Sequence, residues 1–118
     1  MNKKHIVVSA IMGALAVILG AFGAHGLKNI LTPELLETYK TGILYHLIHA
    51  VVLLVLALNT KQNLSIPFYL ILIGIILFSF SLYIYAITEI TFFAMITPLG
   101  GICLIAGWVS LITISLKK

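Results

Sequence analysis

Rare charged residues divide this chain into four long apolar stretches. Uncharged intervals of 23, 20, 27 and 27 residues lie between Lys4 and Lys28, Lys40 and Lys61, Lys61 and Glu89, and Glu89 and Lys117. A helix needs about 20 apolar residues to cross a bilayer, so each interval is long enough for one crossing and too short for two. The pattern predicts a single domain over residues 1–118 with four transmembrane helices, near residues 5–26, 41–59, 66–87 and 92–115.

The first of these stretches could be read as a cleaved signal peptide. Its apolar run from Ile6 to Phe22 is longer than the roughly 7–15 residues of a signal-peptide core. We therefore expect it to be retained as a helix.

Composition places the chain within a membrane. Apolar residues make up 62% of the 118 residues, and charged residues only 8%. Soluble domains carry about 25% charged residues, and disordered chains are poor in apolar residues, so both classes are excluded. The predicted fold class is all-α, a membrane-embedded four-helix bundle.

The lysines predict how the bundle is oriented. Four crossings place the two tails and the loop near 60–65 on one side, with Lys3, Lys4, Lys61, Lys117 and Lys118. The other side has only Lys28 and Lys40, together with all three glutamates. Because lysines concentrate on the cytoplasmic side of a membrane protein, we expect both termini to be cytoplasmic.

The connection between the first two crossings predicts an early start for the second helix. Thr32 is suited to an N-cap, Pro33 to the first helical position and Glu34 to the first turn. We therefore expect this helix to begin near residue 33, before the membrane, and to continue to about residue 59.

Small residues recur at helical spacing in the first and last predicted helices. The candidates for helix packing are Gly13, Gly20, Gly100, Gly101 and Gly107. Small side chains let two membrane helices approach closely. The spacing leaves open whether these helices meet within one chain or between subunits, and it favours a homo-oligomer.

Pro98 interrupts the last predicted helix and is followed by Gly100 and Gly101. Proline removes one helical hydrogen bond, and paired glycines loosen the next turn. We expect the helix to be broken near Pro98, either as a packing kink or as a broken helix that lines a small site.

Several polar or helix-breaking residues are predicted to share one depth. Counted at 1.5 Å per residue from the outer flank, positions roughly 9–15 Å inside include His46, His49, Ser79, Tyr83, Thr97 and Pro98. We expect a pocket in the outer leaflet, lined by His25, Tyr45, His49, Ser79, Tyr83, Thr97 and Pro98. Secondary candidates are His46 within the membrane and Glu34 and Glu37 near the mouth.

His46 and His49 are spaced i, i+3 and share a helix face. Three interpretations stay open. The histidines could bind a transition metal with His25 or a glutamate, relay protons, or stay neutral and form hydrogen bonds within the bundle. The sequence leaves the identity of any cofactor or metal open.

Other chemistries are excluded by what the sequence lacks. It has no Asp, no Arg and a single cysteine, Cys103, so it contains no Ser-His-Asp triad and no thiolate metal cage. It also lacks nucleotide-binding fingerprints. The lysines are scattered at the ends of apolar runs, which is typical of membrane flanks and argues against nucleic-acid binding.

Strings along nearly the whole chain resemble the DUF423 (UPF0382) family of small membrane proteins. They are Gly20 to Leu27 (GAFGAHGL), Thr41-Gly42 with Tyr45 and His49, Phe78-Ser79 with Ser81-Leu82-Tyr83, Thr97-Pro98 with Gly100-Gly101, and Gly107-Trp108. The resemblance implies a four-helix protein of the bacterial inner membrane and brings no biochemical function. His46 and Phe80 depart from the family pattern. The first departure weakens a metal site that needs His46 and leaves His25 and His49 as the better candidates.

Two functions from different classes are compatible with these residues. The first is a small binding or transport unit with a polar pocket in the outer leaflet, whose ligand is a small molecule or a lipid. The alternative is a non-catalytic accessory or scaffold subunit that packs against another membrane complex. An enzyme acting on a lipid or quinone is least favoured, because no nucleophile or cofactor motif accompanies the histidines.

Overall fold

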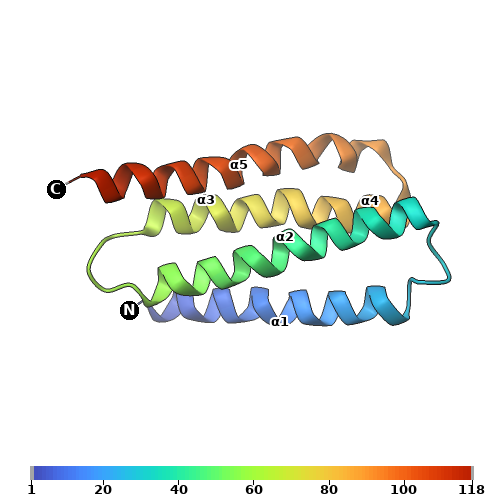
Figure 1. Cartoon of the computed structure of the whole chain (residues 1–118), viewed down its shortest axis with the longest axis horizontal. Helices are drawn as coiled ribbons and strands as arrows, with labels where there is room; N and C mark the ends of the chain where they lie inside the picture. Colours follow the sequence, from blue (N-terminus) through green and yellow to red (C-terminus); the bar gives the residue numbers. More distant parts are fainter. Residues whose placement is uncertain (1, 118) are drawn as a thin grey trace.

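The computed structural model describes residues 2–117, in which every regular element is helical (Figure 1). The elements are α1 (Lys3–His25), α2 (Pro33–Leu58), α3 (Ser65–Ile75), η1 (Ile76–Phe80), α4 (Ser81–Thr88) and α5 (Thr91–Leu116). Elements α3, η1 and α4 follow one another without a gap and form one crossing, Ser65–Thr88. This part of the chain therefore has four helices that are long and apolar enough to span a membrane. The predicted all-α, four-helix fold class is confirmed.

Short polar side chains begin the first two helices. The Asn2 side chain accepts a hydrogen bond from the His5 amide at 3.1 Å, and the Thr32 hydroxyl accepts one from the Leu35 amide at 3.3 Å. Pro33 is the first residue of α2, where its missing N–H costs no helical hydrogen bond. Helix α2 thus begins two turns before Lys40.

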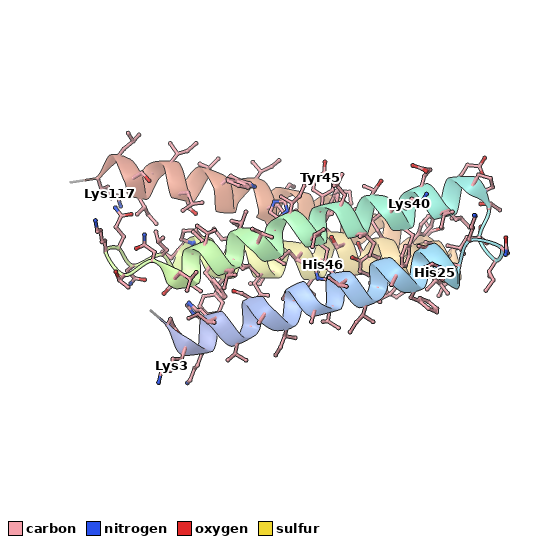
Figure 2. The ribbon with its side chains drawn as sticks, turned by 60° about the horizontal axis from the view of Figure 1, so that its bottom comes forward. Lys3, His25, Lys40, Tyr45, His46 and Lys117 are labelled. Atoms are coloured by element: carbon pink, nitrogen blue, oxygen red, sulfur yellow. The ribbon has the colours of Figure 1, made fainter. Side chains whose placement is uncertain are left out.

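The four crossings lie side by side in a shallow row that measures 52 × 25 × 17 Å (Figures 1 and 2). Helix α1 packs on α2, α2 packs on α3 and α4, and these pack on α5. Within residues 2–117, α1 makes no backbone contact with α5. The bundle is therefore open, and the two outer helices leave most of their apolar side chains uncovered.

The interruption expected in α5 is not present, because this helix continues through Pro98. The irregular backbone is instead in the neighbouring crossing, where η1 is a five-residue π-helix. Gly100 packs directly on that segment: a Cβ at Gly100 would lie 2.6 Å from the Leu77 carbonyl carbon and 2.7 Å from the Phe78 Cα. The glycines after Pro98 therefore allow a close helix approach rather than a break.

The predicted packing glycines differ in their surroundings. Gly107 lies against Ile71, whose Cγ1 would be 2.5 Å from an added Cβ. On α1, nothing lies within 4 Å of such a Cβ at Gly13, and at Gly20 only an ordinary contact with Ile43 forms, at 3.5 Å. Glycine spacing alone does not distinguish a covered helix face from an uncovered one.

Candidate functional site

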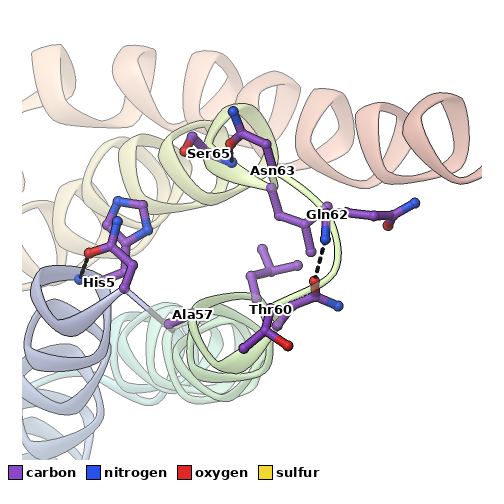
Figure 3. Close-up of a pocket in the computed structure, with 10 residues that line it drawn as sticks. His5, Ala57, Thr60, Gln62, Asn63 and Ser65 are labelled. Atoms are coloured by element: carbon purple, nitrogen blue, oxygen red, sulfur yellow. Dashed lines mark hydrogen bonds between the residues drawn. The ribbon is translucent and has the colours of Figure 1, made fainter.

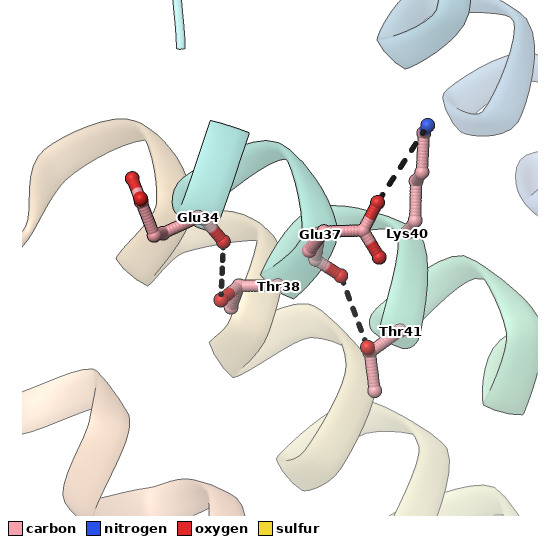
Figure 4. A network of polar contacts seen from close by, with 5 residues as sticks. All are labelled: Glu34, Glu37, Thr38, Lys40 and Thr41. Carbon is pink, nitrogen blue, oxygen red and sulfur yellow. Dashed lines mark hydrogen bonds and ion pairs between the residues drawn. The ribbon is translucent and has the colours of Figure 1, made fainter. Parts of the chain in front are cut away.

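The structure does not gather the predicted pocket residues in one place. His25, Glu34 and Glu37 have exposed side chains at the end of the molecule that also holds Lys40 (Figure 2). Glu37 forms an exposed ion pair with Lys40 at 3.9 Å (Figure 4). The hydroxyls of the neighbouring threonines donate to carbonyls of their own helix. These contacts lie on the surface of one helix and do not form the entrance to a pocket.

His46 lies in the tightly packed interior between α2 and α4. It is fully buried, and its Nδ1 is hydrogen-bonded to the Tyr83 hydroxyl at 2.8 Å. Gly42, one turn earlier, makes room for that tyrosine, because a Cβ at Gly42 would lie 2.7 Å from the Tyr83 Cε1. Among the described residues, His46 Nε2 and the Ser79 hydroxyl are buried and have no hydrogen-bond partner. This arrangement fixes helix packing and leaves little room for a ligand.

A second polar contact joins α4 to α5. The hydroxyls of Ser81 and Thr97 are hydrogen-bonded to each other at 2.6 Å. Each hydroxyl also lies within hydrogen-bond distance of a carbonyl oxygen of its own crossing, Ser81 of Phe78 at 2.9 Å and Thr97 of Phe93 at 3.2 Å. Because each hydroxyl has one proton, one of them donates to the other hydroxyl and only the second donates to its carbonyl. Thr97 thus acts in helix packing, and Pro98 beside it is exposed.

His49 has both ring nitrogens engaged. Its Nδ1 lies 2.7 Å from the Tyr45 carbonyl oxygen, and the Trp108 indole N–H donates to its Nε2 at 3.1 Å. An indole N–H can only donate and a carbonyl can only accept, so the proton of the ring is on Nδ1. His49 is therefore neutral here, with no lone pair left for a metal, and it links α2 to α5.

Beside this link lies an open lateral groove between α2, η1 and α5, with a volume of about 310 Å³. It is lined by Tyr45, His49, Phe78, Gly101, Leu104, Ile105 and Trp108. Gly101 forms part of the floor: an added Cβ would be no closer than 3.7 Å to the Phe78 ring. The groove is mainly apolar, and two of the residues predicted for the pocket, Tyr45 and His49, lie in it.

The predicted common depth is wrong for His49, for a geometric reason. The depth was counted from Lys40, which lies seven residues after the first residue of α2, or about 10 Å along the helix. His49 instead meets Trp108, which is eight residues before the end of α5. The histidine therefore lies farther from the end of the bundle where α2 begins than the Ser81–Thr97 contact does.

The sequence analysis missed a polar cavity at the opposite end. His5 is buried there, with its ring stacked on Phe68 at 4.0 Å and its Nε2 3.1 Å from the Tyr69 hydroxyl. The cavity has a volume of about 220 Å³ and lies between the start of α1 and the loop 59–64 (Figure 3). A usable signal was present in the sequence, because the run Asn59–Ser65 is almost entirely polar and shares a side with His5 in a four-crossing topology.

Metal binding gains no support from this geometry. Among residues 2–117, no three His, Cys, Asp or Glu side chains come together as metal ligands would. His25 lies at the end of α1, well separated from His46 in the middle of the bundle (Figure 2).

Comparison with known proteins places the chain in a family. The family described as "Protein of unknown function (DUF423)" matches residues 19–101. The chain belongs to the DUF423 family. Its similarity to individual members extends over almost the whole length of both sequences.

Three relatives of this DUF423 protein illustrate that similarity. It is 40% identical to the UPF0382 membrane protein YwdK of Bacillus subtilis, over 98% of each chain. It is 38% identical to the UPF0382 membrane protein SSP2132 of Staphylococcus saprophyticus, over 93% of this chain and 94% of the relative. It is 35% identical to the UPF0382 inner membrane protein YgdD of Escherichia coli, over 91% and 85%.

No solved structure matches the chain. With bacterial membrane proteins as relatives and four candidate spans, this DUF423 protein is a multi-pass protein of the bacterial inner membrane.

Proposed function

We propose that this protein is a non-catalytic binding unit that holds an apolar chain in the lateral groove between α2 and α5. The observation that carries the proposal is the groove itself, which is open toward the membrane beside the His49–Trp108 link. Its volume of about 310 Å³ is at the lower end of ligand pockets. That size suits a segment of a lipid or of another long apolar molecule.

The polar groups of the groove favour an amphiphile with few polar atoms. His49 and Trp108 satisfy each other, so they offer no free hydrogen-bonding atom. The Tyr45 side chain is 40% exposed, and among the described residues its hydroxyl is in no hydrogen bond, so it is the group that would meet a polar atom of the ligand. The groove is thus suited to an apolar chain carrying one hydroxyl, carbonyl or ester group.

Gly101 allows a direct test of groove occupancy. A leucine there would fill the floor, whereas an alanine would make only ordinary contacts with Phe78. We expect mass spectrometry of molecules extracted from the purified wild-type protein to detect a defined apolar ligand, at least about tenfold depleted in Gly101→Leu. Gly101→Ala is the matched control and should retain the ligand. Equal ligand content in wild type and Gly101→Leu would reject the proposal.

An accessory role is the second candidate, because α1 has an uncovered face. Gly13 has no neighbour within 4 Å of an added Cβ, and Val17 on the same helix is 65% exposed. A second copy of this chain or another membrane subunit could pack there. This role predicts that Gly13→Leu abolishes complex formation in gentle detergent while the His49→Ala complex persists. Unchanged assembly of Gly13→Leu would exclude α1 as the contact.

A further inference from the structure

The polar cavity near the chain termini has surroundings that select a particular kind of ligand. It lies between the start of α1, the end of α2, the loop 59–64 and the start of α3 (Figure 3). Most of its lining residues carry polar side chains: Asn2, His5, Asn59, Thr60, Gln62, Asn63 and Ser65. The cavity is separate from the lateral groove and shares no lining residue with it.

The three asparagines present mainly hydrogen-bond donors. The Asn2 oxygen accepts from the His5 amide at 3.1 Å, and the Asn63 oxygen accepts from the Ser65 amide at 3.1 Å. The Asn59 oxygen accepts from two amides of the loop, at 3.0 and 2.9 Å. Because a backbone N–H only donates, the engaged atom of each carboxamide is its oxygen. Each asparagine therefore retains an NH₂ group as a free donor.

Among the described residues, the charged side chains at this end are all lysines. Helices α1 and α3 both begin at the cavity and bring their positive dipole ends to it, while α2 ends there with its negative dipole end. Lys3 and Lys117 lie at the same end (Figure 2), and Lys61 is within the loop. Glu34, Glu37 and Glu89 all lie at the other end of the row. Among the described residues, no carboxylate at the cavity competes for its donors.

His5 adds a buried polar group to the wall of the cavity. Its side chain is 8% exposed, and its Nε2 is engaged by Tyr69 while Phe68 supports the ring. Within residues 2–117, no hydrogen bond involves its Nδ1. A rigid imidazole is thus held with one nitrogen available beside the asparagine donors.

We propose that this cavity binds a phosphate group. The unprotonated oxygens of a phosphate accept hydrogen bonds and carry its negative charge, which suits free carboxamide donors, two helix N-termini and flanking lysines. Since the cavity lies at the ends of the transmembrane helices, the phosphate can belong to an anionic phospholipid headgroup or be free in the adjacent aqueous phase.

Asparagine-to-aspartate substitutions test the donors without removing the caps. In Asn59→Asp/Asn63→Asp, the carboxylate oxygens still accept from the loop amides, but the NH₂ donors are replaced by negative charge. Asn29→Asp is the matched control, an exposed asparagine in the connection between α1 and α2 at the opposite end. Lys61→Gln removes one exposed flanking charge and touches no structural hydrogen bond of its side chain.

The probes are phosphatidylglycerol, counted as adducts by native mass spectrometry in mild detergent, and inorganic phosphate, measured by titration calorimetry. We expect wild type and Asn29→Asp to bind one phosphate-bearing molecule. The double variant should bind it about tenfold more weakly, and Lys61→Gln several-fold more weakly. Thermal unfolding in the same detergent checks that the double variant is folded; if it is not, Lys61→Gln decides.

Each outcome assigns or rejects the site. Loss of the phosphatidylglycerol adduct in the double variant, without competition by inorganic phosphate, identifies a lipid headgroup site. Loss of calorimetric phosphate binding with an unchanged adduct count identifies a site for free phosphate. Equal binding of both probes by wild type, the double variant and Lys61→Gln overturns the proposal.

Discussion

His46 and His49 lie one turn apart on α2, yet their surroundings are opposite in kind. His46 is fully buried and hydrogen-bonded to Tyr83 across the interface with α4. His49 reaches to Trp108 on α5 and borders the open lateral groove. An i, i+3 spacing brings two side chains to the same general face, but in this flat row that face is divided between a filled interior and an open groove.

The comparison shows that a polar residue within a membrane helix need not mark a ligand site. Buried polar groups in lipid need partners within the protein, and each histidine has one ring nitrogen hydrogen-bonded to a side chain of another crossing, Tyr83 for His46 and Trp108 for His49. What distinguishes the two histidines is the space beside each one and its partner side chain. Of the two, only His49 with Trp108 has an apolar groove beside it. This difference yields three predictions for stability, given from the largest expected effect to the smallest.

The largest effect is expected at Gly100, where α5 packs directly on the backbone of η1. In Gly100→Ala, the new methyl group would overlap the Phe78 backbone, which cannot rotate away. We expect destabilisation of about 3 kcal/mol, measured by unfolding in mixed micelles. Gly101→Ala, one residue along on the groove side, is the control and should be neutral or slightly stabilising. Similar losses in both variants would show that the two sides of α5 are packed alike.

A smaller effect is expected when the His46 pair is broken. Tyr83→Phe leaves His46 Nδ1 buried without a partner, at a cost of about 1–2 kcal/mol. The double variant His46→Leu/Tyr83→Phe removes the unpaired group as well and should recover part of that loss. The same unfolding assay measures both. If the double variant is instead about 1–2 kcal/mol less stable than Tyr83→Phe, His46 must stabilise the fold through a contact other than its hydrogen bond to Tyr83.

The smallest effect on stability is expected for the partly buried link between His49 and Trp108. Trp108→Phe removes the indole donor to His49 Nε2, and interhelical hydrogen bonds in membranes contribute about 0.6 kcal/mol on average. The Trp108 side chain is 45% exposed, so little buried packing is lost with it. A change as large as that of Tyr83→Phe, in parallel unfolding experiments, would place Trp108 in the core rather than on the rim of a groove.

The four crossings and the start of α2 could be read from the sequence because they depend on local features. Charge spacing and apolar length define a crossing, and Thr32 with Pro33 defines a helix start. The side-by-side arrangement could not be read, because the glycines of α1 and α5 have the same spacing whether or not another helix covers them. Gly13 and Gly107 illustrate this, with no neighbour and a close neighbour respectively.

The candidate site was predictable only in part. Tyr45 and His49 were both predicted to line a pocket, and both line the groove. Trp108 was not included, because depth was counted along each helix separately and Lys40 was used as the membrane boundary of α2. The π-helix at η1 left no recognised sign in the sequence, so the close approach of Gly100 to Phe78 could not be anticipated.

The most direct test of the groove uses Trp108, the only tryptophan in the chain. Its fluorescence can be recorded in lipid nanodiscs that contain a phospholipid with brominated acyl chains, a contact quencher. If an apolar chain occupies the groove, quenching of the wild type should saturate at a low mole fraction of brominated lipid. In Gly101→Leu it should rise only in proportion to that fraction. Identical, proportional quenching curves for the two proteins would contradict the account.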